Sequence, residues 1–291
     1  MHTIRSALLQ AQAQLNNATE LDVIDARYES QLLLQHILNA NRAWLIAHEN
    51  DVLQPANQGR FAALLQRRCN GEPMAYILGK REFYGLDLAV TPAALIPRPD
   101  TEILVDAALE KISENQSMQV LDLGTGTGAI ALAIAQQRPQ AQVTAVDASQ
   151  AALDVAISNG RQHNIANVHF FLSDWFSALS QKKFDVIVSN PPYIEQNDAH
   201  LSQGDLRFEP ISALASGEDG LDDIRRIIDD CLIHLEPQGW LMLEHGYNQA
   251  KPVADLMAQA GLVDIETFKD YGSNDRVTIG RNPLIVSAHW D

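Results

Sequence analysis

The stretch VLDLGTGTGAI, from Val120 to Ile130, decides the fold of this chain. Strand-forming residues lead into three glycines and an alanine-rich run follows, so the pattern predicts a strand, a tight turn and the start of a helix. Because glycine has no Cβ, such a turn lets the backbone approach a ligand closely, and the free N–H groups of the helix point into the same crevice. We therefore expect a ligand site where this strand ends.

The turn by itself leaves the ligand open. Gly124, Gly126 and Ala129 satisfy the relaxed dinucleotide pattern G-x-G-x-x-A, so a nicotinamide or flavin enzyme stands beside a methyltransferase that binds S-adenosylmethionine. A packing turn without a ligand is a third interpretation. Asp147 follows the next strand-like run, where a carboxylate can accept hydrogen bonds from both hydroxyls of a ribose. Both ligands carry a ribose, so Asp147 indicates an adenosine-type site without choosing between them.

From Gln119 onward, apolar runs of strand length alternate with helical patterns. This alternation predicts an α/β domain with a parallel sheet and helices on both faces, because parallel neighbours need crossover connections. The expected strands are 120–123, 143–146, 168–172, 184–189, 240–244, 265–268 and 277–279. One expected helix follows the first strand and ends at 137, two cover 151–163 and 221–235, and one follows the strand 240–244 and ends at 260.

The chain upstream of this domain divides into two segments. Residues 1–73 show apolar faces at helical spacing, which predict a small helical bundle that serves as a packing or substrate-docking module. Residues 74–97 contain aromatic and aliphatic runs broken by glycine, which predict a hairpin linker. The α/β domain then occupies residues 98–291, with Asp100 expected as the N-cap of its first helix. The tail from Asn282 to Asp291 matches no pattern.

Composition disfavours several classes of partner. The chain has 291 residues, 46% of them hydrophobic, and a formal net charge of −16, which argues against a broad phosphate-binding face and so against nucleic acid. It shows no leader pattern and no apolar run near the roughly 18 to 20 residues of a membrane helix, so we expect a cytoplasmic protein without membrane contact. Cys69 and Cys231 lie far apart and the nine histidines form no metal-binding motif, so no metal is expected.

The tetrapeptide Asn190-Pro191-Pro192-Tyr193 carries the predicted chemistry. It follows a strand, so it lies at the carboxyl edge of the sheet beside the glycine turn, where open α/β sheets bind ligands. The prolines fix their own φ and confine Asn190 to extended geometry. The result is a stiff platform that presents the Asn190 side-chain oxygen and the Pro191 carbonyl as two acceptors, with Tyr193 as an aromatic wall.

Two fixed acceptors beside an aromatic wall suit a planar NH2 group. An amide or exocyclic base nitrogen is a poor nucleophile because its lone pair is delocalised, and holding both N–H bonds on acceptors favours the pyramidal geometry in which that pair can attack. The methyl carbon of a sulfonium is already activated by its positive charge, so placement of the reactants supplies most of the catalysis. This chemistry favours a methyltransferase over a dehydrogenase, and an ordinary proline turn is the remaining alternative.

Two further positions have open interpretations. Asp174 and Trp175 follow the expected strand 168–172 and are placed for an adenine, the carboxylate for its exocyclic amine and the ring for its face. A surface turn with a core tryptophan is the alternative. Asp122 either meets the ammonium group of the cofactor through a water or caps the glycine turn.

Several motifs occur together along nearly the whole chain. They are IPRPDTE (96–102), LDLGTGTGAIALA (121–133), VDAS (146–149), SDWF (173–176), SNPPYI (189–194), FEPISAL ahead of GEDGL (208–221) and the linker YILGKREFYG (76–85). The combination resembles the peptide chain release factor glutamine methyltransferases, the HemK or PrmC family. The glycine and N-P-P-Y motifs are shared with many methyltransferases, whereas IPRPDTE and the linker are more particular.

The resemblance implies a class I S-adenosylmethionine-dependent methyltransferase fold, which is Rossmann-like with a mostly parallel seven-stranded sheet, preceded by a helical bundle. It implies methyl transfer from S-adenosylmethionine to the side-chain amide nitrogen of the glutamine in the Gly-Gly-Gln loop of bacterial class I release factors, with S-adenosylhomocysteine as product. Together with Asp174, the residues expected to hold the cofactor are Gly124, Thr125, Gly126, Thr127, Gly128, Asp147, Trp175 and Asn190. Those expected to hold the glutamine are Asn190, Pro191, Pro192 and Tyr193.

Two other functions stay open. A nucleic-acid methyltransferase acting on adenine N6 or cytosine N4 would use the same clamp on a flipped base. The acidic charge and the lack of a basic target-recognition domain disfavour it. A non-catalytic module that only binds the cofactor would have no use for the intact Asn190 and Pro191.

Overall fold

The structure is a computed structural model that describes residues 3–19 and 21–284. Residues 285–291 of the unassigned tail lie outside this range. The chain forms two compact units, Met1–Lys80 with Gln203–Phe208, and Arg81–Ser202 with Glu209–Asp291. In the described part of the chain, no helix combines the length and the apolar character needed to cross a lipid bilayer.

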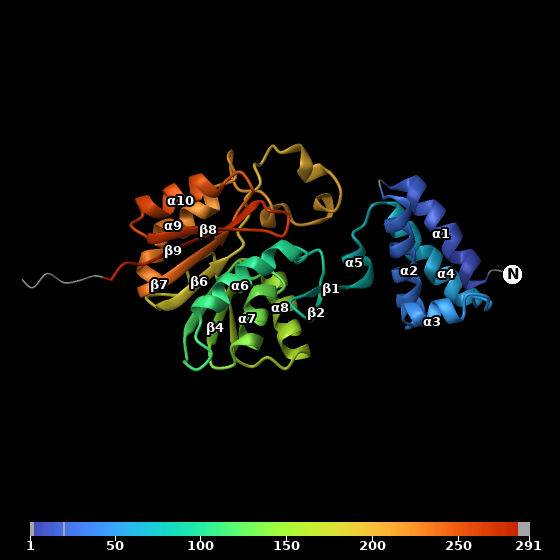
Figure 1. Ribbon diagram of the computed structural model, residues 1–291, viewed down its shortest axis with the longest axis horizontal. Coiled ribbons are helices and arrows are strands. Elements are labelled where there is room, and N and C mark those ends of the chain that lie inside the picture. Colours follow the sequence, from blue (N-terminus) through green and yellow to red (C-terminus); the bar gives the residue numbers. More distant parts are fainter. Residues whose placement is uncertain (1–2, 20, 285–291) are drawn as a thin grey trace, which may run out of the picture. The chain divides into compact units, whose positions relative to one another are not determined.

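The first unit is helical, as expected (Figure 1). Its helices are α1 (Ile4–Ala18), α2 (Val23–Leu38), α3 (Arg42–Ala47), α4 (Pro55–Cys69) and α5 (Met74–Leu78). Asp22 begins α2 by accepting hydrogen bonds from the backbone N–H groups of Ile24 and Asp25 at 2.7 and 2.8 Å. The apolar faces of the helices meet in one core around Leu15, Leu33 and Leu34.

The expected hairpin is shorter than residues 74–97. Met74–Leu78 forms the helix α5, because Pro73 suits the start of a helix and Gly79 ends it in the left-handed conformation at φ 71°. The hairpin itself consists of β1 (Lys80–Phe83) and β2 (Leu86–Ala89).

The second unit contains the seven-stranded sheet that the sequence pattern predicts. Its strands are β3 (Gln119–Leu123), β4 (Gln142–Asp147), β5 (Val168–Leu172), β6 (Phe184–Ser189), β7 (Leu235–Glu244), β8 (Val263–Lys269) and β9 (Asp275–Arg281). The spatial order is β5-β4-β3-β6-β7-β9-β8, with β9 antiparallel to both its neighbours. This confirms the mostly parallel α/β fold class.

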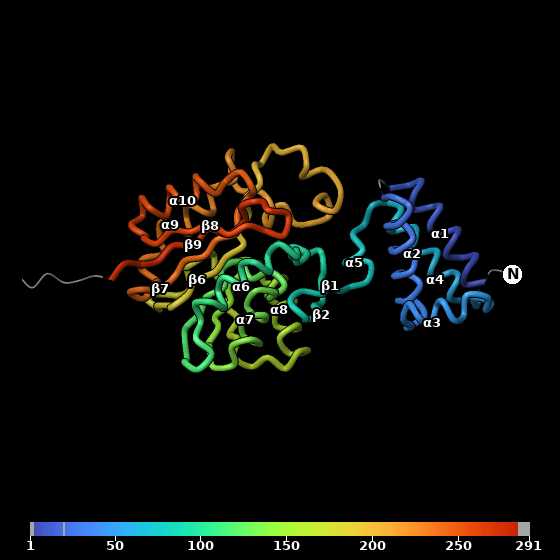
Figure 2. Tube along the Cα trace, viewed as in Figure 1, coloured from blue at the N-terminus to red at the C-terminus, as the bar shows by residue number. Residues whose placement is uncertain are grey.

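Helices cover both faces of the sheet (Figures 1 and 2). They are α6 (Glu102–Lys111), α7 (Ala129–Gln137), α8 (Gln150–Gln162), α9 (Asp222–His234) and α10 (Ala250–Gln259). Short 3-10 turns lie at Pro99–Thr101, Ala199–Ser202 and Ile211–Ala213, and another, Leu206–Phe208, belongs to the first unit. Alternate strand residues point to opposite faces: Val120 packs in the core with α6 and α7, and Leu121 packs in the core with α9 and α10.

The strand order reverses at β3, whose two neighbours are β4 and β6. Leu123 at the end of β3 pairs with Ser189 at the end of β6. The next residues, Gly124 and Asn190, therefore leave the sheet side by side. Such a reversal opens a crevice at the carboxyl edge, so the fold places the glycine turn beside the N-P-P-Y segment.

Candidate functional site

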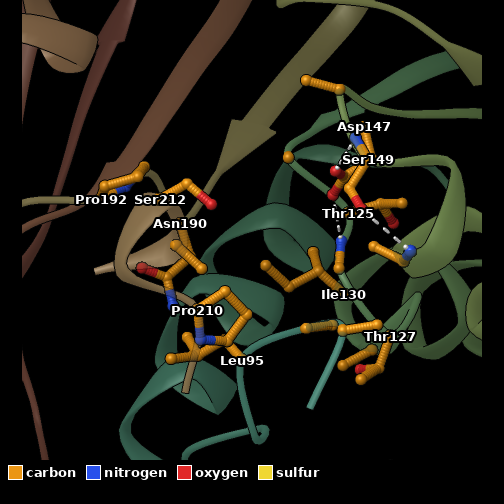
Figure 3. A pocket seen from close by; sticks show the side chains of 18 of the residues that line it. Leu95, Thr125, Thr127, Ile130, Asp147, Ser149, Asn190, Pro192, Pro210 and Ser212 are labelled. Carbon is orange, nitrogen blue, oxygen red and sulfur yellow. Dashed lines mark hydrogen bonds between the residues drawn. The ribbon is translucent and has the colours of Figure 1, made fainter. Parts of the chain in front are cut away.

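A cavity of about 640 Å³ lies at this carboxyl edge of the sheet. Figure 3 shows Asn190, Pro192 and Pro210 on one side of it and Thr125 and Asp147 on the other. Of the residues expected in the site, those that line the cavity are Gly124, Thr125, Gly126, Thr127, Asp147, Asp174, Trp175, Asn190 and Pro192. Gly128, Pro191 and Tyr193 are not among the lining residues.

The glycine turn follows β3 and forms one wall of the cavity. Gly124 and Gly126 have φ values of 71° and 56°, in the left-handed region that favours glycine. A Cβ on Gly124 would lie 3.4 Å from the Trp175 ring. The turn is fixed from β4, because Thr125 N–H donates to the Val146 carbonyl at 2.9 Å.

Gly128 has a different role from the other two glycines. Its φ is 84°, and an added Cβ would lie 3.1 Å from the side chains of both Ala156 and Leu132. The absence of a side chain therefore lets α7 begin close against α8. In this position Gly128 contributes packing that supports the turn.

Asp147 ends β4 with its carboxylate on the cavity. Oδ2 accepts from Gly126 N–H and Oδ1 from Ser149 N–H, both at 2.8 Å. Burial raises the pKa of this carboxyl, while the backbone hydrogen bonds oppose the shift. Each carboxylate oxygen can accept more than one hydrogen bond, so Asp147 has acceptor capacity left for two hydroxyls.

The geometry favours the capping interpretation of Asp122. Its Oδ2 accepts from the Thr125 hydroxyl at 2.6 Å and from Ala131 N–H at 3.2 Å, and the side chain is fully buried away from the cavity lining. Burial raises its pKa to about 7. Asp122 thus links the glycine turn to the first turn of α7.

Asp174 and Trp175 both carry contacts to α9. The Asp174 carboxylate forms an ion pair with Arg226 at 2.8 Å, and Trp175 Nε1 donates to Asp223 Oδ1 at 3.2 Å. These bonds hold the Trp175 ring against the glycine turn. One carboxylate oxygen of Asp174 is therefore already bound to Arg226, a contact that the sequence pattern does not show.

Asn190 presents its side-chain oxygen for a ligand. Its Nδ2 donates to the Thr101 hydroxyl at 3.2 Å, and within the described residues Oδ1 accepts no hydrogen bond. The same holds for the Pro191 carbonyl. The Asn190 oxygen, which lines the cavity, is therefore available to an incoming NH2 group.

Tyr193 does not form the aromatic wall that the tetrapeptide suggested. Its ring packs on the apolar core beneath α9 and α10, and its hydroxyl donates to Glu244 Oε1 at 3.2 Å. The aromatic side chains that line the cavity are Trp175 and Phe83. The N–H groups of Tyr193 and Ile194 both donate to the Leu214 carbonyl, which fixes the backbone of this stretch.

The IPRPDTE segment completes the site through one buried acid. The Glu209 carboxylate is fully buried, accepts from Ile96 N–H at 2.9 Å and pairs with Arg98, which lines the cavity. This pair fastens the loop after β6 to the segment before α6. This ion pair gives a structural role to Arg98 and Glu209, which the sequence motifs alone leave unexplained.

Sequence reasoning missed three residues that support the site: Thr101, Glu209 and Glu244. A usable signal existed for one of them, because Glu244 ends β7, which pairs in parallel with β6, so its side chain emerges at the same edge as Asn190. No comparable periodic signal marks Thr101 or Glu209. No group of three or more potential metal ligands occurs among the described residues.

Comparison with known proteins agrees with this geometry. Residues 6–79 match the PrmC N-terminal domain model, and residues 100–206 match the Methyltransferase small domain model. The chain is 50% identical over 257 residues to the release factor glutamine methyltransferase of Xylella fastidiosa (strain Temecula1), which covers 88% of this chain and 94% of that protein. It is 45% identical over 280 residues to the same-named protein of Escherichia coli (strain K12), covering 96% and 98%.

A solved methyltransferase from Pyrococcus furiosus has the same fold, with a TM-score of 0.53 at 18% identity over 77% of this chain and all of that chain. By contrast, the two domain models match long stretches of this chain, and the two curated relatives share extended sequence identity with it. The chain therefore belongs to the release factor glutamine methyltransferase family.

Proposed function

We propose that this chain transfers a methyl group from S-adenosylmethionine to the side-chain amide nitrogen of the glutamine in the Gly-Gly-Gln motif of bacterial class I release factors. The observation that carries the proposal is the available acceptor Asn190 Oδ1 in the lining of a cavity walled by a glycine turn, with the Pro191 carbonyl as the next acceptor along the chain. Membership of the family supports the choice of a protein amide over a base. We place the reaction in the cytoplasm, where translation terminates.

The cavity has the features that S-adenosylmethionine needs. Asp147 would accept from the ribose hydroxyls, Trp175 would lie on the adenine, and the turn from Gly124 to Thr127 would approach the rest of the ligand without Cβ obstruction. When bound, the cofactor supplies an electrophilic methyl group on a positively charged sulfur. The remaining tasks fall to the chain's own residues.

Those tasks are orientation and exclusion of water. Asn190 Oδ1 and the Pro191 carbonyl would each accept one N–H of the amide, which turns its lone pair towards the cavity. The proton that leaves nitrogen after methylation becomes acidic at that stage, so no base with a raised pKa is needed at the start. Pro192 and Pro210 line the same wall and give it a rigid, apolar surface.

The helical unit is our candidate for docking the release factor. A groove of about 620 Å³ runs between α1, α2 and α3, and Leu9, Ile24 and Tyr28 in it are 60%, 76% and 56% exposed. Exposed apolar side chains gathered in this way mark interaction sites. Three arginines and two acids also line the groove, and Arg5 pairs with Glu49 at 3.5 Å, so the charges largely offset one another and the fitting partner presents mainly apolar side chains.

The proposal is tested by supplying the protein with methyl-labelled S-adenosylmethionine and either a class I release factor or duplex DNA. Label on the glutamine of Gly-Gly-Gln, mapped by mass spectrometry, is the expected result. Label in DNA would point instead to an amino-methyltransferase of nucleic acid. Cofactor binding without label in either substrate would mean a non-catalytic binding module.

A further inference from the structure

The backbone carbonyl of Tyr193, the last residue of the clamp segment (190–193), lies in a notch that the proposed chemistry does not explain. The Gln249 side chain forms one side of the notch, since its Nε2 donates to the Tyr193 carbonyl at 3.0 Å. Gly220 forms the other side with a φ of 74°, and a Cβ added there would lie 2.2 Å from the same carbonyl oxygen. A side chain at position 220 would therefore displace Tyr193.

The Gln249 side chain is buried, and both of its polar atoms have partners. Besides its bond to Tyr193, Nε2 donates to the Asp219 carbonyl at 3.3 Å, and Oε1 accepts from Gly246 N–H at 2.8 Å. The amide thus joins the loop after β7, the loop before α9 and the clamp segment. An amide turned end for end would set its oxygen against two carbonyl oxygens, so these partners also fix its orientation.

The start of α10 does not require a glutamine at this position. Gln249 is the N-cap residue of α10, where serine, threonine, aspartate and asparagine are preferred because their short side chains reach the first free N–H groups. In the described structure the Gln249 side chain makes no such capping bond. It reaches instead to residues 56 and 30 positions earlier in the chain. The contact with Tyr193 is therefore a feature of the site and not of the helix.

Tyr193 is held at three points, so it can act as a fixed end for the clamp segment. Its carbonyl lies in the notch, its N–H donates to the Leu214 carbonyl at 3.2 Å, and its hydroxyl donates to Glu244 Oε1 at 3.2 Å. The two prolines that separate Tyr193 from Asn190 have φ angles locked by their rings. Few rotatable bonds are left between the notch and Asn190, so a shift of the Tyr193 carbonyl moves Asn190 as well.

We propose that Gln249 is a positioning residue: together with Gly220 it seats the Tyr193 carbonyl and so fixes the direction in which the Asn190 oxygen meets the substrate amide. The inference rests on the proposed function, because that oxygen serves a substrate NH2 group. Gln249 is not among the described residues that line the cavity, so it acts through the backbone of the clamp segment. A misplacement of about 1 Å can cost about 100-fold in rate, so a disturbed notch should lower kcat.

The first test is Gln249→Glu in the full-length protein, which keeps the length of the side chain but sets a carboxylate oxygen against the Tyr193 carbonyl. With a release factor that the unaltered protein methylates, we expect kcat to fall about 10- to 100-fold. Gln249→Met, which has a similar length and no charge, should show the same fall. The affinity for S-adenosylmethionine, measured by calorimetry, should stay unchanged in both variants. Gln259→Glu adds the same charge at an exposed position of α10 and should keep a normal kcat.

The second test reaches the same carbonyl from the opposite side. Gly220→Ala drives a Cβ into the Tyr193 carbonyl, whereas Gly261→Ala, also at a left-handed φ of 94°, meets its nearest neighbour at 3.9 Å and serves as the control. We expect Gly220→Ala to lower kcat as Gln249→Glu does. The double variant should be no slower than the slower single variant, because both changes disturb one contact.

Two outcomes would overturn the positioning role and leave the proposed methyl transfer standing. One is a normal kcat in Gln249→Glu. The other is a fall in kcat matched by an equal loss of cofactor affinity, since that pattern marks a general disturbance of the cavity. The proposed function is tested separately, by the label that the unaltered protein places on the glutamine of Gly-Gly-Gln.

Discussion

At the scale of single residues, the site depends on which atoms remain available after the fold has satisfied its own hydrogen bonds. The Asn190 nitrogen donates a hydrogen bond to Thr101, which leaves the Asn190 oxygen for a ligand. By contrast, the Asp174 carboxylate accepts from Arg226, and the Tyr193 hydroxyl donates to Glu244. Sequence alone shows that these residues reach the same edge of the sheet. It does not show how each side chain divides its polar atoms between the protein and a ligand.

The availability of the Asn190 oxygen leads to the first prediction. Asn190→Ala should lower kcat by roughly two to three orders of magnitude, because one preorganised polar group that orients the reacting nitrogen is lost. Initial rates with a release factor and saturating cofactor measure this. Asn115→Ala, in the exposed loop before β3, should have no effect. A near-normal kcat for the Asn190 variant would refute the assigned role.

Asp147 belongs to cofactor binding in this scheme and gives a separable prediction. Asp147→Ala removes the acceptor for the ribose hydroxyls and also frees the N–H groups of Gly126 and Ser149, so S-adenosylmethionine should bind about 10-fold more weakly or worse. Titration calorimetry measures this, with Asp154→Ala on the exposed side of α8 as the matched control. Unchanged affinity would remove Asp147 from the cofactor site.

At the scale of elements, the strands and most helices could be predicted because buried positions recur along the sequence with the period of each element. The predicted boundaries are wrong where a proline or glycine ends or starts an element against that pattern. Asp100 was expected to cap α6, but Pro99–Thr101 forms a 3-10 turn first, and Thr101 precedes α6 without capping it through its side chain. The Thr101 hydroxyl is thereby free to meet Asn190, a contact between residues 89 positions apart that no local pattern encodes.

The start of α7 gives a prediction at the same scale. Gly128→Ala should destabilise the α/β unit by about 1–3 kcal/mol, since the new Cβ meets Ala156 and Leu132 at 3.1 Å in a left-handed conformation. Gly59→Ala in the exposed interior of α4 meets nothing within 4 Å and should stabilise by about 0.5–1 kcal/mol. Calorimetric unfolding of both variants measures the contrast, and equal effects would show that Gly128 is not a packing glycine.

At the scale of the whole molecule, charge is divided unequally between the two units. Residues 1–80 contain seven Lys and Arg and seven Asp and Glu, so the full surplus of −16 lies in residues 81–291. The composition of the entire chain disfavours a nucleic-acid surface, but it conceals this difference between the two units. A partner with acidic groups is repelled by the α/β unit as a whole and tolerated by the helical unit.

This unequal charge leads to a prediction that distinguishes docking of the release factor on the helical unit from methyl transfer in the cavity. Ile24→Glu places a negative charge in the most exposed apolar part of the groove, which should raise KM for a full-length release factor about 10-fold through lost apolar contact and the cost of burying a charge. A short peptide limited to the residues around Gly-Gly-Gln lacks the apolar surface that would dock in the groove, so its KM should not change. Ile233→Glu, equally apolar and 59% exposed on α9, is the control and should leave both substrates unaffected. If Ile24→Glu slowed peptide and protein alike, the groove would act on folding or on the cavity, and docking would have to lie elsewhere on the molecule.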